Sequence, residues 1–470
     1  MSEEKTVGQR LTKELFTEWK NVYETMTDED MTALQGISRD YKNFLNAGRT
    51  ERLCCGEIQR LLKRAGFVEF NAYKEPYEVG EKFFYNHKGK AIIAGVIGRE
   101  DLGSGVNIVA AHLDSPRLDL KMNPLYECDE LALFKTHYYG GIKKYQWTAI
   151  PLALCGVVLT RKGNPVEISI GLDSGDPIFC VTDLLPHLAP DQMSKKATEV
   201  VSGEQLNILV GSVPFKDDKA SEKVKLNIMS ILNQKYGIVE EDFVSAELEM
   251  VPAFPARDLG LDRSMIGAYG HDDRVCAFSA LRAIIEAQEP VRTALAVFVD
   301  KEEIGSMGTT GIRSRFIENL IEDLADMYGV PLRRVLAHST CLSADVNAAF
   351  DPTFPEVSEK RNCARLNGGI CLTKYTGSRG KSGSNDANAE LMGKVRKLFA
   401  DSGVVWQIGE LGKVDQGGGG TVAQYVANLD VETVDCGVAM LSMHAPYEVV
   451  SKADVFMAVK AYRAFFENFK

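Results

Sequence analysis

The chain has 470 residues, of which 45% are hydrophobic and 25% are charged. This length is too great for one simple hydrophobic core and predicts two or three domains. The 41 glycines and 16 prolines are an ordinary globular share, which excludes a disordered, collagen-like or coiled-coil protein. The 54 basic and 65 acidic residues give a net charge of −11, and no long run of Lys and Arg is present. Nucleic acid is therefore not expected as a partner.

The cysteines and the apolar runs bear on location. Ten cysteines are present, most of them inside apolar runs, and no pair has the C-x-x-C spacing of a metal or redox motif. This pattern predicts buried thiols in a reducing compartment. The N-terminal residues are rich in charge, so no secretory signal is expected, and the longest apolar run, about 148–160, is too short to cross a bilayer. We expect a soluble, cytoplasmic protein without a membrane partner.

Hydrophobic periodicity divides the chain into three stretches. Helical spacing dominates the first 70 residues, with Leu11, Leu15, Phe16, Trp19 and Tyr23 along one run. Short β runs follow, and from about Leu125 to Val251 they alternate with turns only. After Pro252 strands and helices alternate, which predicts an α/β core interrupted by an inserted β-rich domain. The expected elements are helices over 275–286, 314–327 and 387–398, strands over 91–98, 107–113, 294–299, 335–344 and 432–440, and a last helix capped by Ser451.

His112 ends an apolar strand and is followed two residues later by Asp114. Because side chains alternate along a strand, both leave the same face at its carboxyl end, where open α/β sheets bind their ligands. A carboxylate placed there can hold one imidazole nitrogen and leave the other for a metal. A partly buried His beside an Asp is the alternative interpretation.

Other acidic residues and a second His occupy similar positions. Taken alone, an Asp pair before a helix is typical of a helix cap, and a Glu pair is typical of a solvated surface. Their coincidence at the ends of distant β runs favours one shared metal site. The residues are Asp272 and Asp273 before an apolar helix, Glu302 and Glu303 after the strand 294–299, Asp345 after an apolar run, and His444 after the run 438–443.

The residue types then indicate the chemistry. A set of His, Asp and Glu without Cys suits a catalytic ion more than a structural one, with Zn²⁺, Mn²⁺ and Co²⁺ as candidates. Five ligands are too many for one open catalytic metal, so we expect two ions that share a bridging carboxylate. A metal-bridging water would attack a carbonyl, and a free Glu would take the proton of that water and pass it to a leaving amine. This combination predicts amide hydrolysis.

Five motifs in this order resemble the aspartyl aminopeptidase/aminopeptidase I family of dinuclear zinc metallopeptidases. The resemblance extends over nearly the whole chain, and the ordered set is far more specific than any single motif. The motifs are His112-x-Asp114 followed by Ser115-Pro116-Arg117, then Asp272-Asp273-Arg274, Glu302-Glu303-Ile304-Gly305, Ser343-Ala344-Asp345 and Met443-His444.

The resemblance implies a role for each residue of the set. Glu302 would be the general base, and Asp114 would orient His112. Two Zn²⁺ ions per subunit would be bound, with Mn²⁺ or Co²⁺ as alternatives. The ligands would be Asp272 bridging both ions, His112 and Asp345 on one ion, and Glu303 and His444 on the other.

The same resemblance implies an architecture and an assembly. We expect an α/β protein: a peptidase-type α/β/α sandwich interrupted by a smaller β-rich dimerisation domain. Residues 1–125 and 252–470 would form the catalytic metallopeptidase domain, and residues 126–251 the inserted domain. Family members assemble into a tetrahedral dodecamer, so a homo-oligomer is expected.

The expected activity is metal-dependent removal of the N-terminal amino acid from peptides. Lys374, Gly418 and Gly419 are candidate substrate residues, because glycines let a peptide backbone approach closely; a flexible surface loop is the alternative. Two other functions are alternatives: a dipeptidase or deacylase on the same metal core, and a catalytically dead self-assembling scaffold. The presence of both Glu302 and Glu303 argues against the scaffold, which needs no free base beside a ligand.

Overall fold

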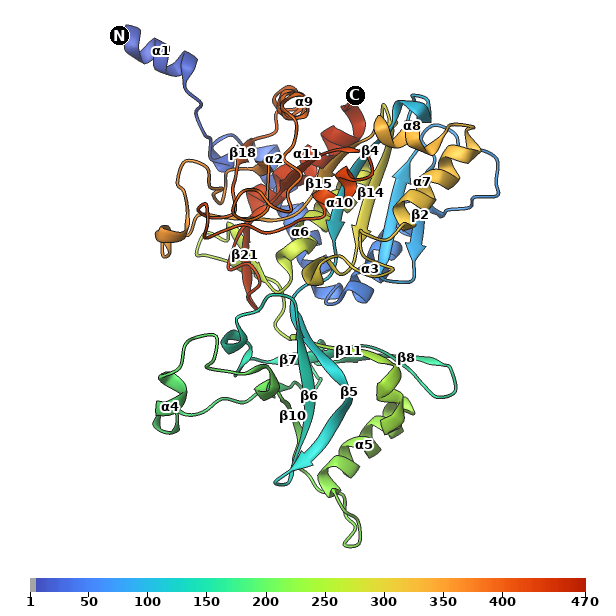
Figure 1. The fold of residues 1–470 in the computed structure, drawn as a ribbon, viewed down its shortest axis with the longest axis vertical. Helices are drawn as coiled ribbons and strands as arrows, with labels where there is room; N and C mark the ends of the chain where they lie inside the picture. Colours follow the sequence, from blue (N-terminus) through green and yellow to red (C-terminus); the bar gives the residue numbers. More distant parts are fainter. Residues whose placement is uncertain (1–5) are drawn as a thin grey trace.

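The structure is a computed structural model that describes residues 6–470. A nine-stranded sheet in the order β1-β2-β3-β14-β4-β15-β19-β17-β18 forms the centre of its larger lobe (Figure 1). β4 (Val106–His112) pairs in parallel with β14 (Thr293–Val299) and β15 (Thr340–Ser343), and β15 pairs in parallel with β19 (Glu432–Gly437). The carboxyl ends of these four strands therefore meet at one edge. The other strands are β1 (Val68–Glu69), β2 (Lys82–His87), β3 (Ala91–Val96), β17 (Ile370–Thr373) and β18 (Trp406–Ile408).

Helices cover both faces of this sheet. All residues of β4 are buried; Val109 and Ala111 belong to one hydrophobic cluster, while Ile108 and Ala110 belong to another. This alternation places a separate core on each face, as in an α/β/α sandwich. The first core is covered by α2 (Asp28–Ala47), α3 (Glu51–Arg64), α6 (His271–Glu286), α9 (Ala389–Asp401) and α11 (Lys452–Asn468). The second core is covered by α7 (Phe316–Met327), α8 (Leu332–Ala337) and α10 (Ala423–Ala427).

A small sheet lies at the edge where the parallel strands end. Its order is β12-β13-β21-β20-β16. β13 leads into α6 through Gly270, and the connection between β20 and β21 carries His444. The strands are β12 (Arg257–Leu259), β13 (Met265–Ala268), β16 (Asn347–Ala348), β20 (Ala439–Leu441) and β21 (Glu448–Ser451).

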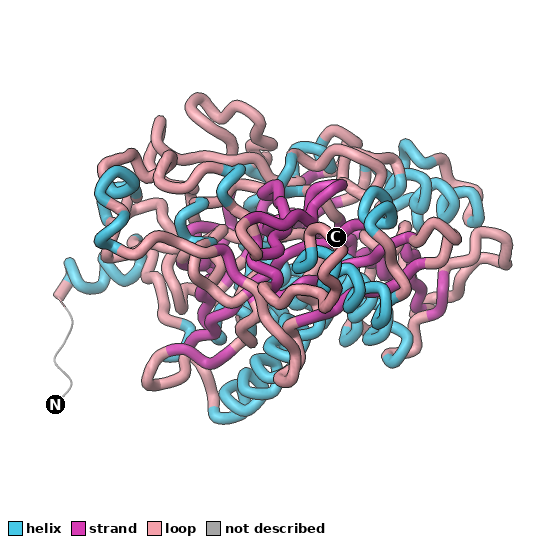
Figure 2. Tube along the Cα trace, turned by 90° about the horizontal axis from the view of Figure 1, so that it is seen from below, coloured by secondary structure: helices cyan, strands magenta, loops and turns pink. Residues whose placement is uncertain are grey.

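Residues 117–252, which we call the insert, form the second lobe, drawn below the first in Figure 1. Its seven-stranded sheet has the order β8-β7-β11-β5-β6-β10-β9 and a hydrophobic core of its own. β5 begins at Arg117, ahead of the boundary at 125/126 expected from the sequence. The elements are β5 (Arg117–Cys128), β6 (Leu131–Tyr139), β7 (Leu152–Leu159), β8 (Pro165–Ile170), β9 (Cys180–Val181), α4 (Pro190–Met193), β10 (Ile208–Gly211), α5 (Lys223–Tyr236) and β11 (Ala246–Pro252). Seen from below, the strands gather in the middle of the molecule with helices and loops around them (Figure 2).

Three expectations from the sequence were wrong in detail. The apolar run 335–344 is not one strand: α8 takes Val335 and Leu336, and β15 begins at Thr340. An apolar run of this length cannot be assigned to a helix or a strand by periodicity alone, and Pro331 favours a helix start just after it. The expected strand 432–440 is likewise two strands, because β19 ends at Gly437 in the large sheet and β20 begins at Ala439 in the small sheet. The other expected helices and the strand 294–299 are confirmed, including the helix that Ser451 caps through the backbone N–H of Ala453.

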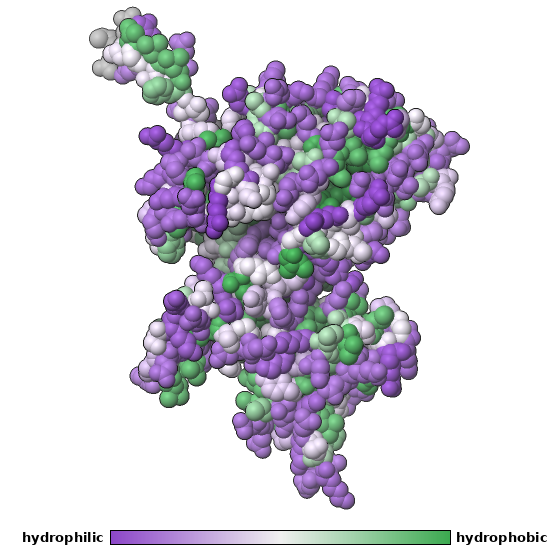
Figure 3. All heavy atoms as spheres, viewed as in Figure 1, coloured by the Kyte–Doolittle hydropathy of each residue, from purple (hydrophilic) through white to green (hydrophobic). Residues whose placement is uncertain are grey.

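The N-terminal helical run is shorter than expected. α1 (Val7–Leu15) ends before Trp19, whose ring packs edge-on against Trp406 at 5.9 Å between centroids. α1 projects from the upper lobe, and its apolar residues, including Leu11, are exposed (Figures 1 and 3). Among the residues described, no helix is long and apolar enough to span a membrane.

Candidate metal centre

The five expected metal ligands come together at the carboxyl edge of the parallel strands. Each lies in or next to a different helix or strand, and the five are far apart in the sequence. His112 is the last residue of β4, Asp272 is the second residue of α6, Glu303 lies in a short 3-10 helix after β14 (Glu302–Ile304), Asp345 follows β15, and His444 lies between β20 and β21.

The carboxylate of Asp272 lies between the two imidazoles. Its Oδ1 is 3.2 Å from Nε2 of His112, and its Oδ2 is 3.2 Å from Nε2 of His444. One carboxylate thus presents each oxygen to a different imidazole. This arrangement suits a residue that bridges two cations. The peptide bond between Asp272 and Asp273 is cis.

The remaining ligands divide between the two sides of Asp272. Nε2 of His112 is 3.9 Å from Oδ1 of Asp345, while Nε2 of His444 is 3.6 Å from Oε2 of Glu303. Two groups of three residues have potential ligand atoms that all lie within 4.8 Å of one another inside the group. The first group is His112, Asp273 and Asp345, and the second is His112, Asp272 and Glu303. Asp273 therefore joins the expected set as a further carboxylate, which also accepts the backbone N–H of His112 at 3.3 Å.

Both imidazoles are oriented by backbone carbonyl groups. Nδ1 of His112 lies 3.0 Å from the carbonyl oxygen of Asp114, and Nδ1 of His444 lies 2.8 Å from that of Gly141. A carbonyl can only accept, so each Nδ1 carries the proton and each Nε2 faces the site. A hydrogen bond from Nδ1 to a carbonyl group commonly orients a histidine whose Nε2 binds a metal ion.

Asp114 has several contacts at once. Its Oδ1 is 3.4 Å from Nδ1 of His112, a longer distance than that of its own carbonyl oxygen. Its carboxylate also accepts the backbone N–H groups of Glu302 and Glu303, each at 3.1 Å, and the hydroxyl of Tyr139 at 2.8 Å. The side chain of Asp114 therefore fixes the two glutamates as well as the imidazole.

The charges of the site call for a cation. Burial raises the pKa of Asp345 and of Glu303 well above the ordinary range, and nearby carboxylates raise both further. Burial also acts to raise the pKa of Asp272, but the hydrogen bonds of the two imidazoles outweigh it and lower that pKa. Buried oxygens of Asp273 and Glu303 have no hydrogen-bond partner in the part of the chain described. Oxygen and imidazole ligands with unsatisfied buried carboxylates fit a divalent ion such as Zn²⁺.

Glu448 is a residue of this site that sequence reasoning missed. It is 1% exposed, and its two carboxylate oxygens accept the backbone N–H groups of His444 at 2.8 Å and of Asp272 at 3.2 Å. It therefore joins two ligands that are far apart in the sequence. Its position four residues after His444 was the only signal available.

The candidate substrate residues lie in another loop cluster. Lys374 forms an ion pair with Asp386, and no hydrogen bond or ion pair joins it to the five ligands within residues 6–470. Gly418 has φ +114°, and a Cβ there would lie 2.1 Å from the carbonyl oxygen of Gly377. Close packing against Gly377 thus accounts for that glycine, while Gly419 would accept a Cβ with 3.4 Å to Leu411. Their part in substrate binding stays a prediction.

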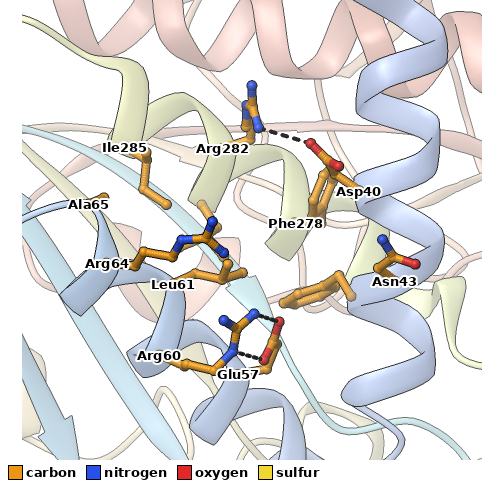
Figure 4. A pocket seen from close by; sticks show the side chains of 12 residues that line it. Asp40, Asn43, Glu57, Arg60, Leu61, Arg64, Ala65, Phe278, Arg282 and Ile285 are labelled. Atoms are coloured by element: carbon orange, nitrogen blue, oxygen red, sulfur yellow. Dashed lines mark hydrogen bonds and ion pairs between the residues drawn. The ribbon is translucent and has the colours of Figure 1, made fainter.

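A separate pocket lies between α2, α3 and α6 (Figure 4). Ion pairs cross its wall, from Arg60 to Glu57 at 2.7 Å and from Arg282 to Asp40 at 3.2 Å. None of the candidate site residues lines it. Its lining contains no histidine, and both of its carboxylates pair with arginines, so it does not compete with the carboxyl edge of the sheet as the reaction centre.

An α/β/α sandwich with clustered His and carboxylate side chains at its parallel strand ends is typical of a metallohydrolase. A family model described as aminopeptidase I zinc metalloprotease (M18) matches residues 44–466. The chain belongs to this family. It is 49% identical over 462 residues to a "Probable M18 family aminopeptidase 1" of Clostridium acetobutylicum, which covers 97% of this chain and 99% of the relative.

Solved structures agree with this assignment. The crystal structure of an M18 family aminopeptidase from Thermotoga maritima is similar with a TM-score of 0.93 and 44% identity, and covers 97% of this chain and 100% of that chain. The crystal structure of aminopeptidase I from Clostridium acetobutylicum has a TM-score of 0.91 and 48% identity, with the same coverage. The protein is therefore a zinc-family metalloaminopeptidase, a hydrolase that removes the N-terminal amino acid from peptides.

Proposed function

We propose that this aminopeptidase works with two metal ions per subunit and that Glu302 is its general base. The observation that carries the proposal is the position of Asp272, with one imidazole 3.2 Å from each of its oxygens. Asp272 would bridge the ions. His112 and Asp345 would complete one, and Glu303 and His444 the other. Zn²⁺ is the expected ion, and the same ligands would admit Mn²⁺ or Co²⁺.

The two glutamates divide the work. Glu303 has its Oε2 3.6 Å from Nε2 of His444, whereas Glu302 forms no ion pair with either imidazole in the described chain. Burial raises the pKa of Glu302 to about 7, so its carboxylate can accept a proton and release it again near neutral pH. When bound, the ions would lower the pKa of a water molecule between them and polarise the substrate carbonyl. Glu302 would accept a proton from the attacking water and pass it to the nitrogen of the leaving amine.

Glu302→Gln tests the base directly. The amide keeps the size of the side chain but cannot accept the proton, so hydrolysis should fall by about 10²- to 10⁴-fold. Zinc content, measured by elemental analysis, should stay near that of the wild type. Glu303→Gln is the matched control, because it should lose bound zinc together with activity. Unchanged turnover in Glu302→Gln would refute the base assignment.

We also propose that the insert mediates self-association into a homo-oligomer, a tetrahedral dodecamer. The support is that several large apolar side chains of the insert are exposed, and that a dodecamer is named for a yeast aminopeptidase of the same fold. The exposed side chains include Leu184, Leu185, Leu188 and Met193. In this proposal the insert is the dimerisation domain, which the sequence placed at residues 126–251, and the rest of the chain, placed at residues 1–125 and 252–470, is the catalytic domain. Light scattering should give the mass of twelve chains, and a monomer would contradict the assembly. The cytoplasmic location stays a prediction.

A further inference from the structure

The end of β6 reaches from the insert into the metal centre. Tyr139, the last residue of β6, donates its hydroxyl hydrogen to Oδ2 of Asp114 at 2.8 Å. Two residues later, the carbonyl oxygen of Gly141 accepts the hydrogen of Nδ1 of His444 at 2.8 Å. Between them, a Cβ on Gly140 would lie 3.2 Å from Oε2 of Glu303. Three consecutive residues of the insert therefore lie beside three residues of the site, and two of them are hydrogen-bonded to it.

Tyr139 is itself held rigidly. It is 8% exposed, and the guanidinium of Arg117 lies 3.8 Å from the centroid of its ring. A cation over an aromatic face is an attractive contact, and burial strengthens it. Arg117 is fixed in turn by Glu249 of the insert at 3.2 Å and by Glu51 of α3 at 3.4 Å. The ring position is thus set by contacts of Arg117 with both lobes.

The hydroxyl of Tyr139 acts on the glutamates through Asp114. The carboxylate that accepts this hydroxyl also accepts the backbone N–H groups of Glu302 and Glu303, each at 3.1 Å. If the hydroxyl is removed, Oδ2 of Asp114 loses one of its donors, and the carboxylate can turn away from the glutamates. A buried acceptor that loses a partner is costly, so the rearrangement is favoured.

We propose that the segment Tyr139–Gly141 makes the insert part of the metal centre of its own chain, with Tyr139 as a positioning residue for Asp114 and the two glutamates. Gly141 fixes the ring of His444 with Nε2 toward the site. The insert is then more than an assembly surface, because a shift of its sheet relative to the large sheet alters metal affinity and turnover. This inference rests on the proposed ligand set.

Tyr139→Phe is the first test, with the exposed Tyr138→Phe as its control. The ring and its contact with Arg117 remain, and only the hydroxyl is lost. We expect the zinc affinity, from competition with a chelator, to fall about 10-fold, as for other second partners of metal ligands. The value of kcat should fall by a similar factor while KM changes less than about twofold, because Tyr139 touches no substrate. Tyr138→Phe should match the wild type in all three quantities.

Gly141→Ala is the second test. A Cβ at this position would lie 3.3 Å from Nδ1 of His444, so the ring has to shift and zinc affinity should fall. His444→Ala separates the two levels of the argument. If it keeps all its zinc, the proposed ligand set is wrong. If it loses zinc while Tyr139→Phe and Gly141→Ala both bind zinc and turn over as the wild type does, the ligand set stands and the inference about the insert is wrong.

Discussion

Two groups of buried charged residues lie on either side of Tyr139, and they differ in where their positive charge comes from. The first, the metal cluster, consists of the five proposed ligands with Asp273 and Glu302. The second, which we call the ion-pair cluster, joins α3, the turn before β3 and the insert. It consists of Glu51, Lys90, Arg117, Asp119 and Glu249, with Lys90 3.1 Å from Glu51 and Arg117 2.8 Å from Asp119.

The difference is visible in the carboxyl groups. Burial acts to raise the pKa of Glu51, but the charges of Arg117 and Lys90 outweigh it and hold that pKa far below the ordinary value. In the metal cluster no Lys or Arg pairs with Glu303 or Asp345 in the described chain, and burial raises both pKa values. Burial of carboxylates thus has two outcomes. Where Lys and Arg side chains lie beside the carboxylates, they form buried ion pairs that stabilise the fold. Where no Lys or Arg is present, the carboxylates form a site that can bind a metal ion.

Removal of the metal should produce the largest effect and separate the two clusters most clearly. Dialysis against a strong chelator should abolish hydrolysis of an aminoacyl reporter substrate, and added Zn²⁺ should restore it. The thermal unfolding midpoint should fall as well, because a ligand that binds only the folded state stabilises it. The ion-pair cluster needs no ion, so the chain should stay folded by circular dichroism. Full activity in a sample shown by elemental analysis to be free of metal would remove the distinction.

Glu51→Gln should give the next largest effect. It leaves Lys90 and Arg117 buried without their shared carboxylate, and removal of one partner from a buried pair costs about 3–5 kcal/mol of unfolding free energy. Denaturant titration measures this loss. Glu57→Gln on the same helix is the control, because its partner Arg60 is exposed and such pairs contribute about 1 kcal/mol or less. Equal losses in the two variants would show that Glu51 does not neutralise the buried cations.

Glu448→Gln should weaken the metal cluster by a smaller amount. Its amide can accept only one of the two backbone N–H groups, from His444 and Asp272, that the carboxylate accepts. Second partners of metal ligands change affinity by about 10- to 100-fold, so the zinc dissociation constant should rise by that factor. The exposed Glu432→Gln should leave the zinc affinity unchanged. A wild-type affinity in Glu448→Gln would show that these two hydrogen bonds do not hold the ligands.

The sequence predicted the sandwich and the convergence of the ligands for a physical reason. Strands buried on both faces, such as β4, are continuous apolar runs, and a His or Asp that ends such a run is conspicuous. Parallel strands bring these ends to one edge. His112 and Asp345 could therefore be placed together before their distance was known.

The supporting residues could not be predicted in this way. Gly141 meets His444 across 303 positions, and its contact uses a carbonyl group that every residue has. In the sequence, Tyr139 and Glu448 are ordinary strand residues. Only the positions of the insert and the small sheet bring them to the site. The ion-pair cluster could not be predicted for the same reason, since the sequence pattern of Glu51 is that of an ordinary acidic residue in the first turn of a helix. Such contacts depend on how the two lobes pack against each other, and hydrophobic periodicity does not predict that packing.

Glu249→Gln should give the smallest effect and defines the limit of the comparison. Three carboxylates of the ion-pair cluster, the buried Glu51 and Glu249 and the partly exposed Asp119, lie around Lys90 and Arg117, and Glu247 also pairs with Lys90 at 3.1 Å. Burial raises the pKa of Glu249 well above its ordinary value of 4.5. This shift favours the protonated form of Glu249 in the folded protein, and the variant tests that state. The amide of Gln has the shape of a protonated Glu249, so with the proton in place the unfolding free energy at pH 7 should change by about 1 kcal/mol or less.

The pH dependence of this variant checks the argument by its sign. Between pH 4.5 and the raised pKa, the folded wild type holds a proton on Glu249 that the unfolded chain has released. The stability of the wild type contributed by this group must fall as pH rises through that window, whereas Glu249→Gln lacks the proton and the slope. Denaturant titrations at pH 5 and pH 8 should therefore show the variant gaining stability relative to the wild type. A change in the opposite direction would mean that Glu249 is ionised and that the ion-pair cluster, like the metal cluster, carries excess negative charge.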